Sequence, residues 1–132
     1  MALTKPRIMT QVQEGICIVT IQDASILDER NIAMLGKDLE KLVTDQNYIN
    51  MIIDMTHVSY LSSAVLGKLM ALYKKIKGEK GDLKLCNVKA EIRPIFAVTQ
   101  LDKVIEIHET LIAAVNSFKK KTGIFGLFSK KK

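Results

Sequence analysis

The chain has 132 residues, of which 48% are hydrophobic, so it is long enough and apolar enough to bury the core of a single domain. No apolar run reaches 18 residues and none lies near the first residue, so neither a transmembrane helix nor a signal peptide is expected. The formal charge of +6 comes from six lysines in residues 119–132, because residues 1–118 carry 14 basic and 14 acidic side chains. The balanced charge of residues 1–118 argues against nucleic-acid binding by the domain.

The first predicted elements are a β-hairpin and a helix. Residues 7–13 and 16–23 are rich in β-branched and apolar residues and are separated by a Glu-Gly turn at residues 14–15, so we expect them to pair antiparallel. Ser25 or Asp28 is expected to cap the helix that follows. Apolar residues recur along this helix at amphipathic spacing, at Ile32, Leu35, Leu39, Leu42 and Val43.

Strands and helices alternate through the rest of the chain. The expected strands cover residues 48–55, 83–88 and 103–107, and the expected helices start at residues 62–63 and cover residues 91–101 and 110–120. The helix after the two serines has an apolar stripe formed by Leu66, Leu69, Met70, Tyr73 and Ile76. Helical crossovers between strands imply parallel pairing with right-handed connections. The predicted class is α/β, with a mixed, mostly parallel sheet of about five strands, an N-terminal hairpin and four helices.

Motifs of catalysis are absent from the sequence. It contains no GxSxG, GxGxxG, GxxxxGK[ST] or HExxH pattern, so no enzyme activity and no cofactor are expected. His57 and His108 lie far apart and have no ligand partners at metal spacing. Cys17 and Cys86 lie in strand-like runs without a CxxC pattern, which predicts two buried thiols. Asp54 ends a strand of the parallel set, where it can serve function or can cap the following loop.

Two adjacent serines, Ser62 and Ser63, open the second predicted helix in the stretch YLSSAVLGKL. Serine is a favoured N-cap residue, which stabilises a helix by about 1 kcal/mol relative to alanine. The same position lies at the carboxyl end of a central strand and at a helix N-terminus, where backbone N–H groups and the helix dipole favour an anion. A phosphate here would add a charge of about −1.5 to −2 without unfolding the helix. Helix capping and a phosphorylation switch are both consistent with this placement.

Residues 52–107 resemble the STAS domain of bacterial anti-sigma factor antagonists. The family has an aspartate-ended strand, a short loop and an Asp-Ser-Ser/Thr-Gly-Leu-Gly motif that opens a helix, where this chain has Ser-Ser-Ala-Val-Leu-Gly at 62–67. A glycine-bounded turn, a strand like LKLCNV, a helix like EIRPIFAVTQLDK and a short strand then follow in the family's order. The resemblance implies the STAS fold.

The resemblance also implies a function. Anti-sigma factor antagonists are non-enzymatic proteins that bind a serine kinase which is also an anti-sigma factor; phosphorylation by this kinase ends the binding, and a phosphatase restores it. The family's phosphoserine falls on Ser63, and Ser62 stands in place of the aspartate and is a second candidate. Val65 adds bulk where the family has glycine, and the loss of the aspartate removes a charge that a kinase reads. The expected partner-binding residues are Asp54, His57, Ser59, Ser62, Ser63, Lys68, Lys74 and Lys75.

A different role is also open to a STAS domain. It can be a constitutive subunit of a scaffold or of a membrane transport assembly, without phosphorylation. Residues 1–118 are expected to form the STAS domain, and residues 119–132 a flexible, basic, phenylalanine-containing tail. Lysines and phenylalanines together allow weak contact with an anionic membrane surface, whereas a simply solvated tail would make none. The chain is expected to be cytoplasmic in either case.

Overall fold

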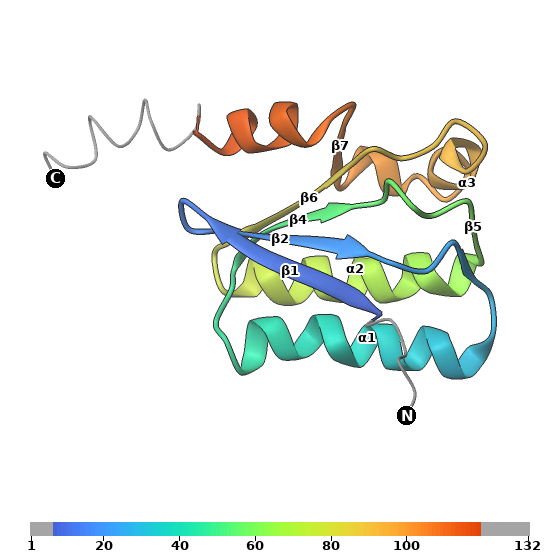
Figure 1. Ribbon diagram of the computed structural model, residues 1–132, viewed down its shortest axis with the longest axis horizontal. Coiled ribbons are helices and arrows are strands. Elements are labelled where there is room, and N and C mark those ends of the chain that lie inside the picture. Colours follow the sequence, from blue (N-terminus) through green and yellow to red (C-terminus); the bar gives the residue numbers. More distant parts are fainter. Residues whose placement is uncertain (1–6, 120–132) are drawn as a thin grey trace, which may run out of the picture.

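A five-stranded mixed sheet forms the centre of the computed structural model, which describes residues 7–119 (Figure 1). The strands are β1 Ile8–Gln13, β2 Ile16–Ile21, β4 Asn50–Asp54, β6 Asp82–Cys86 and β7 Glu106–His108. Their order in the sheet is β1-β2-β4-β6-β7, with β1 antiparallel to β2 and every other pair parallel. The mixed, mostly parallel sheet and the N-terminal hairpin are therefore confirmed.

The hairpin turn has the geometry that its sequence predicts. Glu14 and Gly15 both have positive φ, at 54° and 81°, and Gln13 pairs directly with Ile16. Two central residues with positive φ match the right-handed twist of the strands on either side, and glycine adopts this conformation without steric cost.

Helices cover both faces of the sheet. They are α1 Glu29–Thr44, α2 Ser63–Gly78, α3 Arg93–Val98 and a last helix over residues 111–119. Figure 1 shows α1 and α2 side by side below the sheet, the last helix above it, and α3 near the carboxyl ends of the parallel strands. These four helices and the mixed sheet confirm the predicted fold class. None of the helices within residues 7–119 is long and apolar enough to cross a membrane.

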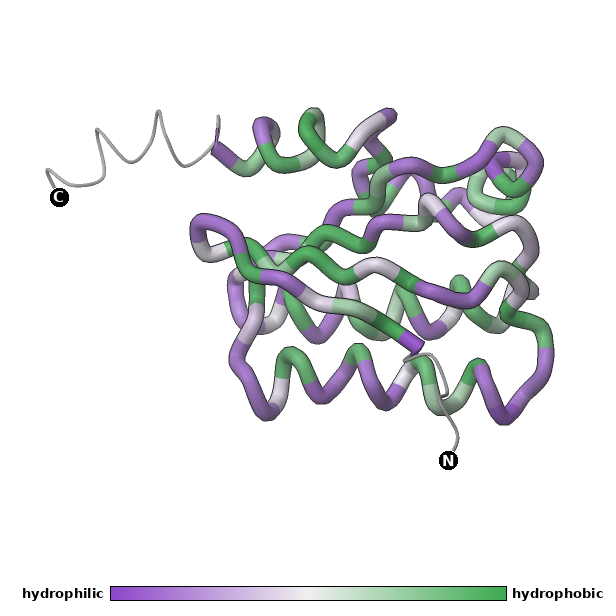
Figure 2. Tube along the Cα trace, in the orientation of Figure 1, coloured by the Kyte–Doolittle hydropathy of each residue, from purple (hydrophilic) through white to green (hydrophobic). Residues whose placement is uncertain are grey.

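The main core lies between the sheet and α1 and α2, where apolar segments of the central strands and of both helices meet (Figure 2). The helical residues buried here are Ile32, Leu35, Leu39 and Val43 of α1 and Val65, Leu66, Leu69, Leu72 and Ile76 of α2. Burying each such side chain contributes roughly 1.5–3 kcal/mol, so this layer fixes where α2 begins relative to the sheet. The predicted stripe on α2 is confirmed, although Met70 and Tyr73 are only partly buried and Val65 and Leu72 belong to it.

The last helix packs on the opposite face of the sheet over a smaller apolar cluster. This cluster consists of Ile16, Ile18, Ile52, Cys86, Ala114, Val115 and Phe118. Cys17 and Cys86 are free and buried, as the sequence predicts. Burial raises the pKa of Cys17 to about 11 and, together with the charge of Asp54, raises the pKa of Cys86 to about 12, so both stay protonated thiols at neutral pH.

A small second sheet was not predicted. It consists of the strands β3 Ser25–Ile26 and β5 Tyr60–Leu61, which pair in parallel. Two-residue strands are too short to show an alternating pattern, so periodicity could not reveal them. Ser25 lies in β3, and Asp28 is therefore the cap of α1: its Oδ1 accepts a hydrogen bond from the backbone N–H of Asn31 at 2.9 Å.

Two element boundaries near the end of the chain differ from the prediction. The helix expected over 91–101 is shorter, because α3 ends at Val98 and a separate 3₁₀ helix covers Leu101–Lys103. The strand expected over 103–107 consequently starts later, as β7 at Glu106. The predicted tail lies outside the described residues except for Lys119, which belongs to the last helix and whose Nζ lies 3.2 Å from Oε1 of Glu14.

Candidate functional site

The two serines have different roles at the start of α2. Ser62 is the N-cap residue, and its extended backbone donates to the carbonyl oxygen of Ile26 at 3.2 Å. Its hydroxyl makes no capping hydrogen bond and is buried, without a hydrogen-bond partner among the described residues. The expected side-chain cap is therefore wrong for Ser62. A buried hydroxyl is also inaccessible to a kinase, which argues against Ser62 as a second phosphorylation site.

Ser63 is the first residue of α2, and its side chain is exposed. The first turn of this 16-residue helix contains no Asp or Glu, so no acidic side chain of that turn neutralises its N–H groups. These N–H groups and the helix dipole create a partial positive charge where the Ser63 side chain leaves the backbone. An anion on the Ser63 hydroxyl would be stabilised here by the helix that it starts.

Asp54 holds the loop that leads to the serines. Asp54 is 9% exposed, and its Oδ1 accepts hydrogen bonds from the backbone N–H of Thr56 at 3.1 Å and from Nδ2 of Asn87 at 3.0 Å. The sequence leaves open whether Asp54 serves function or caps the following loop. These contacts are those of a residue that fixes the loop. Any effect of Asp54 on a partner would therefore act through the shape of residues 55–62.

The middle of this loop is held from two sides. The backbone N–H groups of Ser59 and Tyr60 both donate to the carbonyl oxygen of Ala24, at 2.8 and 3.0 Å. On the other side, Nζ of Lys89 donates to the hydroxyl of Ser59 at 3.2 Å. Sequence analysis missed Lys89, because it lies 30 residues away along the chain and belongs to no motif. His57 lies in the same loop and is exposed.

Within residues 7–119, no group of His, Cys, Asp and Glu could hold a metal ion.

Two exposed apolar side chains lie beside the serines and were also missed. Tyr60 of β5 is 63% exposed, and Leu27, directly after β3, is 58% exposed. Tyr60 pairs with Ser25 in the small sheet, and Leu27 follows directly after the end of β3. Exposed aromatic and aliphatic side chains of this kind suit the core of a protein interface.

The three predicted lysines of α2 lie at different distances from Ser63 along the helix axis. With a rise of about 1.5 Å per residue, Lys68 lies roughly 8 Å from Ser63 along the helix axis, and Lys74 and Lys75 lie roughly 17–18 Å away. Nζ of Lys75 also lies 3.8 Å from Oε2 of Glu40 on α1. Only Lys68 is therefore close enough to share a local contact with Ser63, and Lys74 and Lys75 would need a partner that covers most of α2.

Known proteins share the arrangement of these elements. A family model described as STAS domain matches residues 7–114. BtrV of Bordetella bronchiseptica, named as an anti-sigma factor antagonist, is 25% identical over 106 residues, which cover 80% of this chain and 89% of that protein. The crystal structure of an anti-sigma factor antagonist from Mycobacterium paratuberculosis matches with a TM-score of 0.73 and 24% identity, over 87% of this chain and 97% of that one.

The same fold occurs in proteins of different roles. The phosphorylated form of the Bacillus cell fate determinant SpoIIAA matches with a TM-score of 0.65 and 12% identity, over 84% of this chain and 98% of that one. A sulfate transporter family protein from Wolinella succinogenes matches with a TM-score of 0.68 and 12% identity, over 83% and 88%. At this identity the likeness concerns the fold alone. The match of the family model over residues 7–114 shows that this protein belongs to the STAS domain family, in which a relative similar to it is named an anti-sigma factor antagonist.

Proposed function

We propose that this chain is an anti-sigma factor antagonist whose binding to an anti-sigma factor with serine kinase activity is switched by phosphorylation of Ser63. The observation that carries the proposal is the position of Ser63 as the exposed first residue of a long helix without acidic side chains in its first turn. The unphosphorylated form binds the kinase through the loop before α2 and the start of that helix. Phosphorylation adds charge at this contact and ends the binding, and a phosphatase reverses it.

The composition of the surface around Ser63 supports a role in binding. Tyr60 and Leu27 offer apolar contact area, and His57, Ser59 and Lys68 add polar groups at its margin. A relative named as an anti-sigma factor antagonist covers most of the chain, and a structure of the same fold is of a phosphorylated form. The chain acts in this proposal by changing partners in the cytoplasm, and none of its residues carries out a chemical step.

Incubation with serine kinases encoded near its gene tests the modification directly. The full-length chain should gain the mass of one phosphate in the presence of ATP, and fragment mass spectra should place the phosphate on Ser63. The variant Ser63→Ala should gain none. A phosphate found on Ser62 or elsewhere, or no modification by any of these kinases, would contradict the proposal.

Phosphorylation is expected to leave the fold intact, because a phosphate on Ser63 lies at a helix N-terminus that favours anions. In ¹H–¹⁵N spectra of the phosphorylated chain, amide shifts should change mainly in residues 54–70. Unfolding temperatures of the two forms should agree within about 3 °C, since favourable charge–dipole interactions contribute less than about 1 kcal/mol at exposed positions. A loss of dispersion throughout the spectrum would instead show that phosphorylation unfolds the domain.

A second candidate function, a constitutive subunit at a membrane surface, is favoured by the composition of residues 119–132. This segment contains six lysines and no acid, with Ile124, Phe125, Leu127 and Phe128 between them. Each lysine near an anionic bilayer contributes about 1 kcal/mol, which is an upper bound because salt screens it. The apolar residues would add interfacial contact. This candidate rests on the sequence of residues 119–132.

Removing residues 119–132 separates the two candidates. The full-length chain should bind vesicles of anionic lipid weakly and in a salt-sensitive way, and the chain truncated after Phe118 should not bind. The truncated chain should keep its unfolding temperature within about 3 °C, since an exposed ion pair such as Lys119–Glu14 contributes little. Cosedimentation with vesicles measures binding. Equal binding by both chains, or none by either at low salt, would remove the support for a membrane role.

A further inference from the structure

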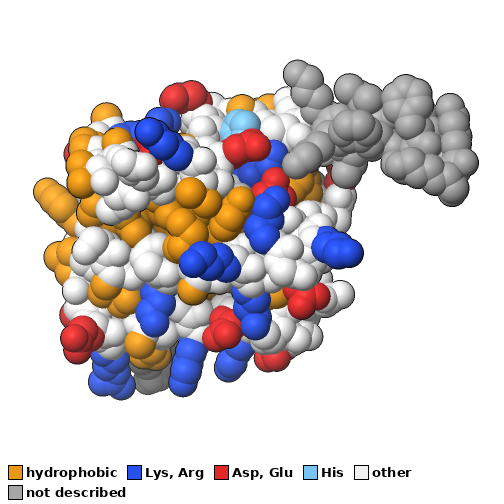
Figure 3. Space-filling model, turned by 180° about the vertical axis from the view of Figure 1, so that it is seen from behind, with side chains coloured by type: hydrophobic (Ala, Val, Ile, Leu, Met, Phe, Trp, Pro, Cys, Tyr) orange, Lys and Arg blue, Asp and Glu red, His pale blue; other side chains and the backbone are white. Residues whose placement is uncertain are grey.

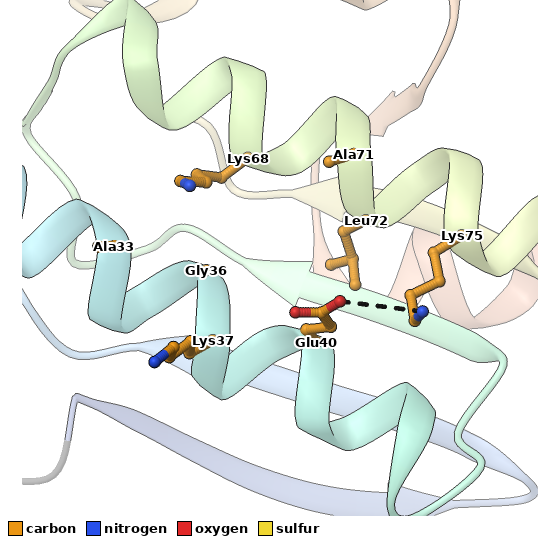
Figure 4. Close-up of a pocket in the computed structure, with 8 residues that line it drawn as sticks. All are labelled: Ala33, Gly36, Lys37, Glu40, Lys68, Ala71, Leu72 and Lys75. Atoms are coloured by element: carbon orange, nitrogen blue, oxygen red, sulfur yellow. Dashed lines mark ion pairs between the residues drawn. The ribbon is translucent and has the colours of Figure 1, made fainter.

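A groove runs between α1 and α2 on the outer surface of the helical layer (Figure 4). Its volume is about 330 Å³, and the residues that line it are Ala33, Gly36, Lys37, Glu40, Lys68, Ala71, Leu72 and Lys75. The small residues Ala33, Gly36 and Ala71 leave space between the helices, and Leu72, which is 4% exposed, supplies apolar surface at the base. Grooves of this size accept one or a few side chains of a ligand.

The charge of the groove is positive, although residues 1–118 carry no net charge. Three lysines and one carboxylate line it, and Oε2 of Glu40 is already paired with Lys75 at 3.8 Å. Among the described residues, no ion pair or hydrogen bond engages the amino groups of Lys37 and Lys68. Figure 4 shows these two lysines on opposite helices, while Glu40 and Lys75 meet farther along, toward the helix C-termini.

Gly36 determines where Lys68 lies. A Cβ atom at Gly36 would lie 2.9 Å from Cδ of Lys68, so the aliphatic stem of Lys68 crosses α1 at the one position of the groove that lacks a side chain. A lysine stem that packs on apolar surface keeps its ammonium group at the edge, where it can meet a charged ligand. The position of this ammonium group therefore depends on the packing of α1 against α2.

We propose that the groove between α1 and α2 is a docking site for an acidic peptide segment of a protein partner. Carboxylates of the segment pair with Lys37 and Lys68, and an apolar side chain between them fills the space over Ala33, Ala71 and Leu72. Charge complementarity of this kind sets partner choice and orientation. A small inorganic anion would leave the apolar surface unused, and the chain's own basic residues 119–132 carry the wrong charge.

This docking site shares Lys68 with the margin of the proposed contact around Ser63, but its other lining residues lie outside that contact. The groove lies along the middle of both helices, which show acidic and basic side chains interspersed over their outer surface (Figure 3). Binding in the groove would therefore persist in Ser63→Asp, and the two proposals can fail separately.

Titration of the isotope-labelled full-length chain with a capped octapeptide of alternating glutamate and leucine tests the site. Amide and methyl shifts should change at Ala33, Gly36 and Ala71. The double variant Lys37→Glu/Lys68→Glu should bind at least tenfold more weakly. The matched control Lys41→Glu/Lys74→Glu makes the same change in net charge at exposed lysines of the same helices outside the groove, and its affinity should fall less than threefold.

Gly36→Ala tests the shape of the groove without changing charge. Alanine favours a helix over glycine, so the variant should be at least as stable as the wild type, whereas its new methyl group displaces Lys68 and should weaken peptide binding at least threefold. Equal peptide affinity in the two double variants would overturn the proposal. It would also be overturned if inorganic phosphate at equal charge gave the same shifts, or if sedimentation showed that a second copy of the chain covers the groove.

Discussion

Replacing Ser63 by aspartate is expected to weaken the complex with the anti-sigma kinase by about 100-fold. Ser63 is exposed at the start of α2, between apolar contact area formed by Tyr60 and Leu27 and the basic side chain of Lys68. In the complex, a carboxylate at this position would lose water against a partner surface that accepts a neutral serine and offers no new positive charge. A factor of about 100 corresponds to about 2.7 kcal/mol, within the range for an unpaired charge in a protein interface. Isothermal titration calorimetry with the purified kinase measures this difference.

Two further variants separate the switch from general effects of charge. Ser63→Ala should bind the kinase within about threefold of the wild type, because it removes one exposed hydroxyl, but it should not be phosphorylated. Gln46→Asp adds the same charge at an exposed position beyond the C-terminus of α1, far from the start of α2, and should bind normally. Equal affinity for wild type and Ser63→Asp would rule out a switch that acts through charge at Ser63.

The elements that sequence analysis located well are those with a strong local pattern. The stripe from Ile32 to Val43 has helical spacing, and these residues are buried in α1. The hairpin was readable because a glutamate-glycine pair between two apolar runs predicts a two-residue turn. Ser63 was likewise found from its local position, at the junction of a buried strand and an amphipathic helix. The local sequence was sufficient to predict each of these features.

Features that depend on contacts between distant residues could not be predicted. Lys89 reaches Ser59 only because β6 lies beside β4, and its side chain belongs to no local pattern. One of the two serines was expected to cap α2 with its hydroxyl, but the sequence could not show that the N-cap residue, Ser62, makes no capping hydrogen bond. The pairing of β3 with β5, which places the end of β3 beside Tyr60 and Leu61, involves strands of only two residues. The apolar part of the candidate site was missed for that reason.

Replacing Lys84 by alanine is expected to destabilise the domain by about 2–4 kcal/mol and to loosen the last helix. Lys84 is one of two buried charged residues among those that the structure describes, at 2% exposure. Its Nζ lies 2.7 Å from the hydroxyl of Ser117, 3.1 Å from Oε1 of Glu106 and 4.6 Å from the ring centre of Phe118. It therefore joins the last helix to β6 and β7. Denaturant unfolding and amide exchange in residues 111–119 measure the two effects.

Lys84→Met keeps most of the aliphatic stem and removes the charge, so it separates packing from electrostatics. It should cost less than about 1.5 kcal/mol, because Glu106 is 55% exposed and can be hydrated, and the Ser117 hydroxyl still donates to the carbonyl oxygen of Ala114 at 2.7 Å. A loss as large as that of Lys84→Ala would show instead that the charge contacts hold the helix.

The pH dependence of the stability of Lys84→Met tests whether the charge of Lys84 stabilises the fold through Glu106. Partial burial raises the pKa of Glu106, but hydrogen bonds from His108 at 2.9 Å and from Lys84, with their positive charges, bring it below the ordinary value of 4.5. A carboxyl group with a lowered pKa in the folded state stabilises the fold above its unfolded pKa and loses this effect as pH falls through its folded pKa. The stability difference between wild type and Lys84→Met should therefore shrink as pH falls below 4.5. A difference that stays constant or grows over this range would show that Lys84 acts through its stem alone.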